Sequence, residues 1–341
     1  GLGPYTISNR DGGDRIRLEA NPNWPGSPLP RSQSITVRFY NDVAGLRRSL
    51  AEFQSVDLAW TGLPFNDFLE LQNQDMDDDG NIDIIPWIGP STFKSYLIFE
   101  QTTPPWDNIK VRQAVSYILD RQAIVDQVFS NRRRSLFSPI PDEVPAALAT
   151  LPEPDLEKAE ALMLEAGYTR ENPLAITLWY VNDGRYSDVE EQYIGAISSQ
   201  LQSTGLFQVE IGGAPWDQFR VQVAECGYPA YLLGWPTPGR PANYLDPSSW
   251  TDFFVQETGS IICSNYQSEK MDALVQADRE ELDVQARAGI YAQIQELWAE
   301  ELPTLDLTQE PRRALSLAKV DDVAIDALGL LHYELLFKSA E

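Results

Sequence analysis

An acidic segment in the first third of the chain has the spacing of a calcium-binding loop. From Asp75 to Asp83 the sequence reads DMDDDGNID, with aspartates at positions 1, 3, 5 and 9 of an EF-hand-type loop and Gly80 at position 6. Alternate carboxylates followed by glycine let a short loop surround one hard cation with oxygen ligands. Because position 12 is Pro86 instead of a bidentate glutamate, a solvated acidic turn is the competing interpretation. The candidate ligands of a structural ion are Asp75, Asp77, Asp79 and Asp83.

A second candidate site is the segment GWPTPGRPANYLDP, residues 234–247, which follows a short apolar run. It combines four prolines with Trp235, Arg240 and Tyr244. Prolines fix φ and remove backbone donors, so the segment predicts a stiff loop that leaves the end of a strand. Rigid loops that display aromatic side chains often bind ligands. The competing interpretation is that Trp235 caps a hydrophobic core.

Two other strand ends carry candidate ligand-binding side chains. The expected strand LAITLWY, residues 174–180, is followed by a polar loop, and the expected strand VDLAW ends beside Thr61. Ligands of α/β sheets commonly bind at the carboxyl ends of strands, although a solvated turn is an equal alternative for the first loop. The candidates are Tyr180, Asn182, Arg185 and Tyr186 in the first loop and Trp60 and Thr61 at the second strand end.

Cys226 and Cys263 are the only cysteines of the 341 residues. A lone pair is compatible with two buried thiols or with one disulfide. We favour the disulfide, which in the chain-entropy model would stabilise the fold by about 3–4 kcal/mol. It would also indicate an exported protein.

Composition and charge exclude several classes of function. The net charge of −25 makes nucleic acids unfavourable partners, because their phosphates would be repelled. No apolar run approaches the roughly 18 residues of a membrane span. Nucleophile and metal motifs such as GxSxG, a Walker loop and HExxH do not occur in the sequence. A carboxylate pair of the glycosidase type is the remaining enzymatic alternative.

Strands alternate with helices along the chain, which predicts an α/β fold with a mostly parallel sheet covered on both faces. Asp107 is the expected cap of one long helix that reaches Phe129, Asp155 caps a second helix, and Gly167 ends that second helix. The expected strands are residues 5–8, 15–19, 34–40, 56–60, 82–87, 95–100, 174–180, 207–211, the run before Gly234, and 304–309. Further helices are expected at 42–53, 188–204, after Pro215, at 269–282 and at 284–301.

Several of these segments resemble, in the same order, the extracytoplasmic solute-binding proteins of ABC transporters, family 5, which includes oligopeptide and dipeptide receptors. The most specific match is PPWDNIKVRQAVSYILDRQAIV, residues 104–125, and the resemblance extends over essentially the whole chain. The other matching segments are GLGPYTI at 1–7, ANPNW at 20–24, VDLAW at 56–60, PDLEKAEALMLEAGY at 154–168, Gly234-Trp235 and 243–247.

The resemblance implies the two-lobed periplasmic-binding-protein fold of the Venus-flytrap type (type II, cluster C). Residues 1–103 and 311–341 would form lobe I, and residues 104–310 lobe II, joined by crossing strands. Since the sequence starts in the middle of the family pattern, the N-terminal part of lobe I is expected to be absent. Ligand would bind between the lobes and stabilise their closed arrangement.

The function implied by the resemblance is that of a periplasmic or extracytoplasmic receptor, and not of an enzyme. It would capture a small molecule or peptide and deliver it to the permease subunits of an ABC importer. It would meet the membrane only through the permease or a removed lipid anchor, and would need no cofactor beyond the candidate structural calcium. The alternatives are a ligand sensor without a transport role and a periplasmic carboxylate-dependent hydrolase.

The resemblance also indicates which kind of ligand to expect. Trp235 matches the family's cleft tryptophan, which implies that it packs on the ligand. Peptide-binding members place an acidic residue shortly after it, whereas this chain has Pro236-Thr237-Pro238 and then Arg240. The loss of that carboxylate removes an anchor for an α-amine. We therefore expect a peptide-like, opine-like or oligosaccharide-like ligand with an anionic or hydroxylated end, bound by Arg240 or Arg185.

Three remaining features have structural interpretations. The basic run Arg132 to Arg134 is expected in a solvent-exposed loop, with a permease contact as the alternative. The single histidine, His332, lies in an apolar setting typical of a core residue. Trp216, at the start of a helix, is also expected in the core.

Overall fold

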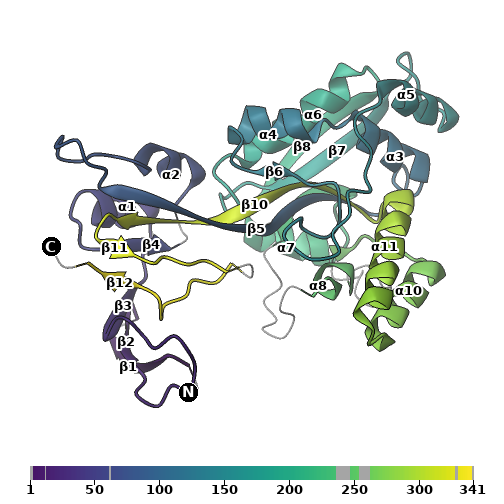
Figure 1. Cartoon of the computed structure of the whole chain (residues 1–341). Coiled ribbons are helices and arrows are strands. Elements are labelled where there is room, and N and C mark those ends of the chain that lie inside the picture. The colour runs from purple at the N-terminus through teal and green to yellow at the C-terminus, as the bar shows by residue number, and fades with distance from the viewer. Residues whose placement is uncertain are drawn as a thin grey trace. The chain divides into compact units, whose positions relative to one another are not determined.

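The computed structural model describes residues 3–11, 13–60, 63–235, 246–252, 262–326 and 329–339 (Figure 1). The chain divides into two compact units. Unit 1 comprises Gly1–Pro90 with Pro311–Glu341, and unit 2 comprises Ser91–Glu310. Both divisions fall inside long strands, β5 (Ile84–Phe99) and β10 (Thr304–Leu317). Among the described residues, no helix has the length and apolar composition that crossing a membrane requires.

Unit 1 contains a three-stranded antiparallel sheet, β1 (Tyr5–Asp11), β2 (Arg15–Ala20) and β3 (Ser34–Arg38), in that order. β4 (Leu58–Trp60) pairs antiparallel with the unit 1 part of β10, and β11 (Val320–Asp321) pairs with β12 (Phe337–Lys338). Two helices complete the unit, α1 (Val43–Ala51) and α2 (Phe65–Leu71).

The core of unit 1 lies between these helices and the sheet strands. Asp42 begins α1 by accepting a 2.6 Å hydrogen bond from the Gly45 N–H, which satisfies one of the free donors of the first turn. Leu50 of α1 and Phe68 of α2 then pack with Ile84 and Leu315. Burial of such side chains stabilises each by roughly 1.5–3 kcal/mol.

Unit 2 is built on the strands β5, β9 (Ala230–Trp235), β7 (Leu174–Val181) and β8 (Phe207–Ala214), in that spatial order. β7 pairs in parallel with both β8 and β9, whereas β5 pairs antiparallel with β9. The short β6 (Arg134–Ser135) pairs antiparallel with β10. The prediction of a mostly parallel sheet is therefore wrong, and the sheet is mixed. Parallel pairs need crossover helices, and these join only β7, β8 and β9, while β5 and β10 pass between the units.

Helices surround the unit 2 strands, and the contacts of α6 and α7 with β7 follow from their positions as crossovers (Figure 1). A core of Tyr96, Phe219, Tyr228 and Tyr231 lies against α7. Among the residues of unit 2 that the structure describes, the helices are α3 (Ile109–Ile118), α4 (Arg121–Phe129), α5 (Leu156–Glu165), α6 (Glu190–Ser203), α7 (Trp216–Ala224), α8 (Ser248–Thr251), α10 (Glu269–Glu280) and α11 (Val284–Glu301).

The single helix expected from Asp107 to Phe129 is in fact two helices. α3 begins after Asn108, whose side chain accepts from the Lys110 N–H at 3.0 Å, so Asp107 is not the cap. Leu119 is extended, and Asp120 starts α4 by accepting from the Ala123 N–H at 2.8 Å. An aspartate inside an apolar helical pattern can cap a new helix instead of continuing the old one.

The expected ends of α5 are confirmed. Asp155 accepts from the Lys158 N–H at 3.0 Å, and Gly167 adopts φ +93° after the last helical residue. Glycine adopts this left-handed conformation without strain because it has no Cβ atom to clash. The predicted cap pair therefore sets both helix ends.

Candidate functional site

The carboxyl end of β7 and the neighbouring end of β9 form the candidate ligand-binding face of unit 2. Gly234 lies beneath two aromatic rings, those of Phe93 and Tyr186, whose centroids are 6.2 Å apart. A Cβ at Gly234 would lie 2.7 Å from an atom of each ring. The close approach of these rings explains why glycine precedes Trp235.

The loop after β7 is attached to the start of α7. The Trp216 N–H donates to Asp183 at 2.7 Å, and the Arg185 guanidinium carbon lies 4.1 Å from the Trp216 ring centroid. Tyr186 meets Trp216 edge to face, with centroids 6.1 Å apart. The structure thus brings Arg185, Tyr186 and Trp216 together. Trp216 is partly buried and packs against the hydrophobic core that contains Tyr228 and Tyr231, so it lies at the edge of the core in which it was expected.

The environments of these side chains differ. Tyr186 is half-buried, and this burial raises the pKa of its hydroxyl to about 12, against the opposing effect of Arg185. Arg185 itself is exposed. A guanidinium that stacks on an indole keeps its planar N–H edge available for a carboxylate or hydroxyl partner. The face therefore combines aromatic surface with an oriented cation.

Tyr180 and Asn182 do not join this group. Tyr180 is buried, and burial raises the pKa of its hydroxyl, with Glu191 and Glu190 of α6 contributing. Asn182 is exposed, and its N–H donates to the Ala214 carbonyl at 3.1 Å, which extends the pairing of β7 with β8. Residues two positions apart on a strand face the same side of a sheet, and the side chains of Tyr180 and Asn182 both lie beside Gly213 of β8.

In unit 1, Trp60 is partly buried against a core that includes Ala314, Val320 and Leu331. It also lines a groove of about 890 Å³ within the same unit. Thr61, Arg240, Tyr244 and the side chain of Trp235 lie outside the described residues. Their roles in ligand binding stay predictions.

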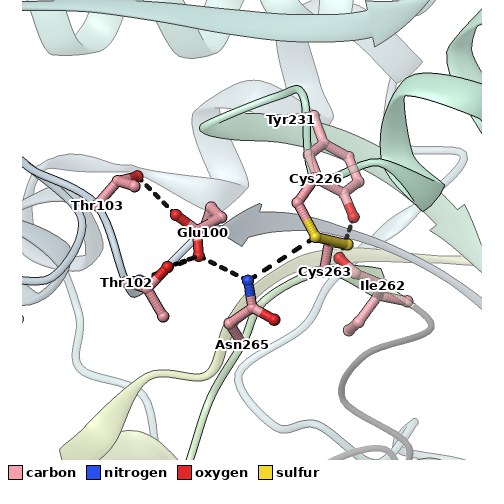
Figure 2. Close-up of a disulfide and its surroundings, with 8 residues drawn as sticks. All are labelled: Glu100, Thr102, Thr103, Cys226, Tyr231, Ile262, Cys263 and Asn265. Atoms are coloured by element: carbon pink, nitrogen blue, oxygen red, sulfur yellow. Dashed lines mark hydrogen bonds between the residues drawn. A yellow bond between two sulfur atoms is a disulfide. The ribbon is translucent and has the colours of Figure 1, made fainter.

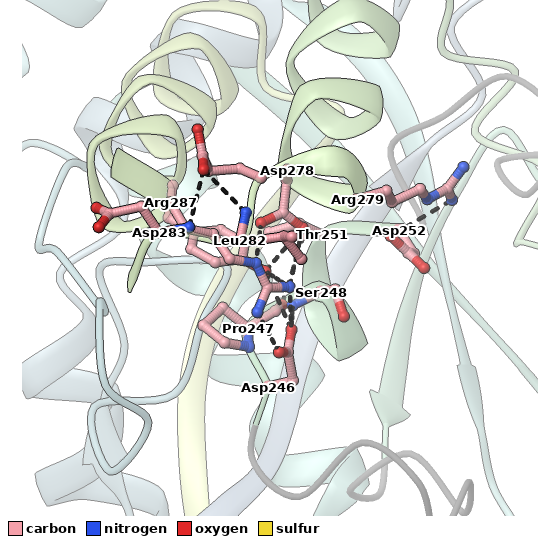
Figure 3. Close-up of polar contacts among 12 residues, drawn as sticks. Asp246, Pro247, Ser248, Thr251, Asp252, Asp278, Arg279, Leu282, Asp283 and Arg287 are labelled. Carbon is pink, nitrogen blue, oxygen red and sulfur yellow. Dashed lines mark hydrogen bonds and ion pairs between the residues drawn. The ribbon is translucent and has the colours of Figure 1, made fainter. Parts of the chain in front are cut away.

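The described end of the Gly234–Pro247 segment is anchored on α10 and α11 (Figure 3). Arg287 contacts Asp246 at 2.5 and 2.9 Å and Asp278 at 2.7 Å, and the Tyr291 hydroxyl donates to Asp278 at 2.8 Å. Partial burial raises the pKa of Asp246, but hydrogen bonds from Arg287 and Ser248 outweigh it and lower the pKa to about 2. Sequence analysis did not identify Arg287. One of its carboxylate partners, Asp246, lies 41 positions away in the chain, and the other, Asp278, lies on the preceding helix α10.

The predicted disulfide between Cys226 and Cys263 is confirmed. Figure 2 shows Asn265 donating to the Glu100 carboxylate at 2.7 Å while also approaching the sulfur of Cys226 at 3.8 Å. The Tyr231 hydroxyl donates to the carbonyl of Ile262 beside the disulfide. These contacts attach the strand ends of β5 and β9 to the chain that enters α10.

The buried Glu100 is the acceptor at the centre of this group. It receives hydrogen bonds from the Thr102 N–H at 3.1 Å and the Thr103 hydroxyl at 2.6 Å, in addition to Asn265. Burial alone would raise its pKa, but these hydrogen bonds lower it below the usual glutamate value. A carboxylate that accepts several hydrogen bonds stays ionised.

Arg133 is buried, with 3% exposure, so the expected solvent-exposed loop is wrong for the centre of the basic run. Its guanidinium contacts Glu310 at 2.6 Å and donates to the Ser95 hydroxyl at 3.2 Å. The Phe129 ring lies 4.0 Å from it. Pairing with a carboxylate and an aromatic face offsets the cost of burying the charge, which sequence patterns do not reveal.

His332 is also not a core residue. It is half-buried and contacts Glu334 at 2.8 Å through Nδ1 and Asp326 at 3.3 Å through Nε2. The hydrogen bond to Glu334 raises the pKa of the imidazole above its usual value, and the Asp326 charge adds to this effect. The apolar neighbours in the sequence concealed these carboxylate partners.

Three of the four candidate calcium ligands of the acidic loop come together. Oxygens of Asp75, Asp77 and Asp83 lie within 4.8 Å of one another. The Gly80 N–H donates to Asp75 at 2.8 Å, with Gly80 at φ +89°. The carboxylate of Asp79 instead accepts from the backbone and side-chain amides of Asn81. Such a loop offers oxygen ligands of the kind that Ca²⁺ prefers.

Comparison with known families decides the identity of the chain. The model of the family described as bacterial extracellular solute-binding proteins, family 5 Middle, matches residues 1–260. The chain belongs to this family. Its members are extracellular, which confirms the predicted extracytoplasmic location.

The names of the similar proteins refer to different ligands. The nickel-binding protein NikA of Staphylococcus aureus is 26% identical over 336 residues, which is 97% of this chain and 63% of NikA. The periplasmic oligopeptide-binding protein OppA of Escherichia coli is 23% identical over 302 residues, covering 86% of this chain and 52% of OppA. The chain thus spans about half to two thirds of the length of these relatives.

Solved structures confirm the predicted family fold. A dipeptide-binding protein from Pseudoalteromonas sp. SM9913, in complex with Met-Leu, matches with a TM-score of 0.76 at 21% identity, covering 99% of this chain and 64% of that one. CtaP from Listeria monocytogenes matches with a TM-score of 0.83 at 18% identity, with 99% and 67% covered. This likeness establishes the α/β periplasmic-binding-protein fold.

Proposed function

We propose that this family 5 protein is a receptor that captures a small solute between two lobes and delivers it to an ABC importer. The lobes correspond to residues 1–103 with 311–341 and to residues 104–310. The observation that carries the proposal is the family membership of a chain in which the exposed Arg185, beyond the β7 end, meets the partly buried rings of Tyr186 and Trp216 in one aromatic and cationic face. Ligand on both lobes would favour closure, because a ligand shifts a conformational equilibrium only through contacts that differ between the states.

The proposed ligand has an anionic or hydroxylated end and is peptide-like, opine-like or oligosaccharide-like. Arg185 is held by the Trp216 ring, while Asp183 is occupied by the Trp216 N–H. The guanidinium is therefore the charged group of this loop that is oriented for a ligand. The proposed binding residues are Trp235, Arg240, Tyr244, Tyr180, Asn182, Arg185, Tyr186, Trp60 and Thr61.

The experiment combines mass spectrometry of co-purifying molecules with a thermal-shift screen. Peptides, oligosaccharides, opines and organic anions are tested on wild type, Trp235→Ala and Arg185→Gln, with Arg220→Gln as the matched control on α7. Loss of a charge-assisted hydrogen bond in Arg185→Gln should weaken binding of the best ligand by about tenfold or more. Equal affinity of wild type, Trp235→Ala and Arg185→Gln would remove this face from the site.

We infer further that the receptor releases its ligand chemically unchanged, and that its membrane partner is an ABC permease. Incubation of the best ligand with the protein should leave the ligand mass unaltered, whereas hydrolysis would favour the carboxylate-dependent hydrolase. Protein-dependent uptake by vesicles that contain the permease and its ATPase would support transport. Binding without uptake would favour the sensor.

We also propose that the acidic loop binds a structural calcium ion. The gathering of Asp75, Asp77 and Asp83 in one turn supports this assignment, and Asp79 would join them by exchanging its Asn81 contacts for the ion. Like charges so close together repel, and a divalent cation relieves that repulsion. The ion would be the only cofactor and would stabilise unit 1 without taking part in ligand binding.

A further inference from the structure

Two long strands carry the chain between the compact units. The units divide after Pro90 in β5 and after Glu310 in β10, and these two strands are neighbours in the sheet. In Figure 1 they run side by side. Any movement of one unit against the other requires a change of direction in both strands near these positions, since a hinge consists of a few residues that absorb the backbone rotation.

Arg133 contacts both strands on the unit 2 side of the division. Its Nη1 donates to the Ser95 hydroxyl of β5 at 3.2 Å, and its Nη2 lies 2.6 Å from the Glu310 carboxylate of β10. The following residues form β6, in which Arg134 and Ser135 pair with Gln309 and Thr308. This pairing places Arg133 next to the last unit 2 residue of β10.

The guanidinium is enclosed by helices of unit 2. The rings of Phe129 on α4 and Tyr193 on α6 lie 4.0 and 5.7 Å from it, and Glu190 of α6 lies 4.0 Å from Nη2. Tyr193 in turn contacts Thr308 of β10 through its hydroxyl at 3.2 Å. A planar guanidinium bound at several points and excluded from water holds its partners in one geometry.

A second ionic contact joins the two strands within unit 2. Lys94 of β5 contacts Asp306 of β10 at 2.7 Å and donates to the carbonyl of Pro139 at 2.8 Å. Both side chains are buried. Along β10, Asp306 lies four residues before Glu310, so there the Arg133 contact reaches closer to the division between the units than the Lys94 contact does, whereas along β5 Lys94 and Ser95 are adjacent.

We propose that Arg133 is a positioning residue for lobe closure. It holds β10 on unit 2 up to Glu310 and joins that strand to Ser95 of β5, and thereby confines the bending of β10 to the residues that follow Glu310. Without it, the segment of β10 that bends becomes longer and the range of lobe orientations becomes wider. The inference rests on the proposed receptor function, because it assigns Arg133 a part in the closure that this function requires.

The test measures the distance between the units in ligand-free protein. Spin labels are attached at Glu52→Cys in unit 1 and Gln208→Cys in unit 2, two exposed positions. Distance distributions from double electron–electron resonance are compared for the parent, Arg133→Gln and Glu310→Gln. We expect both variants to broaden the distribution and shift its mean. Any ligand found for the wild type should bind them with an affinity changed by about fivefold or more, a typical coupling between a conformational equilibrium and binding.

Arg134→Gln is the matched control, since Arg134 is adjacent in the sequence but exposed and paired with Glu143 at 2.9 Å. Its distribution should equal that of the parent. A merely structural role for Arg133 would lower the melting temperature of the variants and leave the distances unchanged. Unchanged distances in folded Arg133→Gln and Glu310→Gln would therefore overturn the proposal.

If Arg133→Gln does not fold, the proposal is tested with Glu310→Gln and Arg133→Lys. The lysine variant keeps the positive charge but cannot make the two-point contact. A parental distance distribution in both of these would equally refute the proposal. Failure of the proposed receptor function would be seen differently, as a wild type that binds no ligand. The distances in ligand-free protein can still be measured in that case. The two ideas are thus tested separately.

Discussion

Arg287 on α11 makes a two-point ion pair with Asp246, with nitrogen–oxygen distances of 2.5 and 2.9 Å. Asp246 directly follows residues 236–245, which contain the predicted ligand-binding residues Arg240 and Tyr244. The guanidinium is shared with Asp278 and Tyr291, so one arginine contacts two carboxylates. This relationship fixes one end of the candidate loop to a long helix.

Replacement of Arg287 by Met should lower the free energy of unfolding by about 2–4 kcal/mol, because it leaves the buried carboxylate of Asp278 and the partly buried carboxylate of Asp246 without their cation. Urea denaturation measures this loss. Arg279→Met is the control, since its contact with Asp252 is longer, 3.4 Å, and more exposed; its cost should be below about 1 kcal/mol. Similar losses in the two variants would contradict the assigned importance of Arg287.

The same pair predicts acid sensitivity. The pKa of Asp246 is lowered to about 2 from an ordinary value of 3.8. Its stabilising contribution is therefore complete above pH 3.8 and disappears as the pH falls through 2. In Arg287→Met this part of the acid dependence should be missing, which denaturation between pH 2 and pH 5 would reveal.

Glu190 should affect stability at high pH, in contrast to Asp246, whose contribution is lost at low pH. Burial raises the pKa of Glu190 to about 7 from 4.5; Arg133 opposes the shift and Glu310 adds to it. Folding therefore favours the protonated form, so stability is highest below pH 4.5 and falls as the pH rises through 7. One pKa unit corresponds to ~1.4 kcal/mol, and we expect Glu190→Gln to recover about 2–3 kcal/mol at pH 8 and little at pH 5.

Thermal denaturation from pH 5 to pH 8 tests the role of Glu190. Glu191→Gln, at the exposed neighbouring position, is the control and should leave the pH profile unchanged. A parallel profile for wild type and Glu190→Gln would show that Glu190 is not a protonated buried group. The tyrosines Tyr180 and Tyr186 also face this carboxyl, but their raised pKa values keep them neutral in this range.

Gly234→Ala should both destabilise the protein and disturb the ligand-binding face. The new Cβ would lie 2.7 Å from the rings of Phe93 and Tyr186, so one or both rings must move. We expect a loss of about 1–3 kcal/mol, as for other overpacked sites. Gly289→Ala on α11 meets no atom within 4 Å and should instead stabilise by up to about 1 kcal/mol. Equal stability of the two variants in urea would contradict the close approach at Gly234.

Calcium should raise the melting temperature of the wild type, whereas Asp75→Asn should abolish most of that rise. Asp75 lies among the three gathered carboxylates and also accepts the Gly80 N–H. Asp78→Asn, in the same loop but outside that group, is the control and should respond to calcium as the wild type does. Differential scanning calorimetry with calcium or with a chelator measures the effect, and an unchanged melting temperature in the wild type would reject the site.

Much of the local structure was predictable because its causes are local. Asp42 and Asp155 begin helices through hydrogen bonds to the third residue after them, and Gly167 ends one because it adopts a positive φ. Side-chain capping and backbone sterics act over a few residues, so the sequence around each position contains the information. Asp120 shows the limit, since the same capping chemistry divided a helix that apolar periodicity alone predicted to continue.

The candidate site was only partly predictable. Arg185 and Tyr186 were identified from their place after a strand, but their contact with Trp216, which begins α7, depends on how that helix packs. The partners of Arg133 lie on β5, α6 and β10, and those of His332 are carboxylates that its apolar neighbours concealed. Each case depends on groups that are distant in the sequence and desolvated together.

By itself the sequence determined the α/β class, the family pattern and the helix caps at Asp42 and Asp155, and it favoured the pairing of Cys226 with Cys263. Only the tertiary structure decided that the sheet is mixed, that Arg133 is buried between carboxylates and that Gly234 lies under two rings. The physical reason is the distance along the chain over which each interaction acts. Helix capping and backbone strain act between residues that are close in the sequence. Burial, ion pairing and close packing depend instead on which distant segments the fold brings into contact.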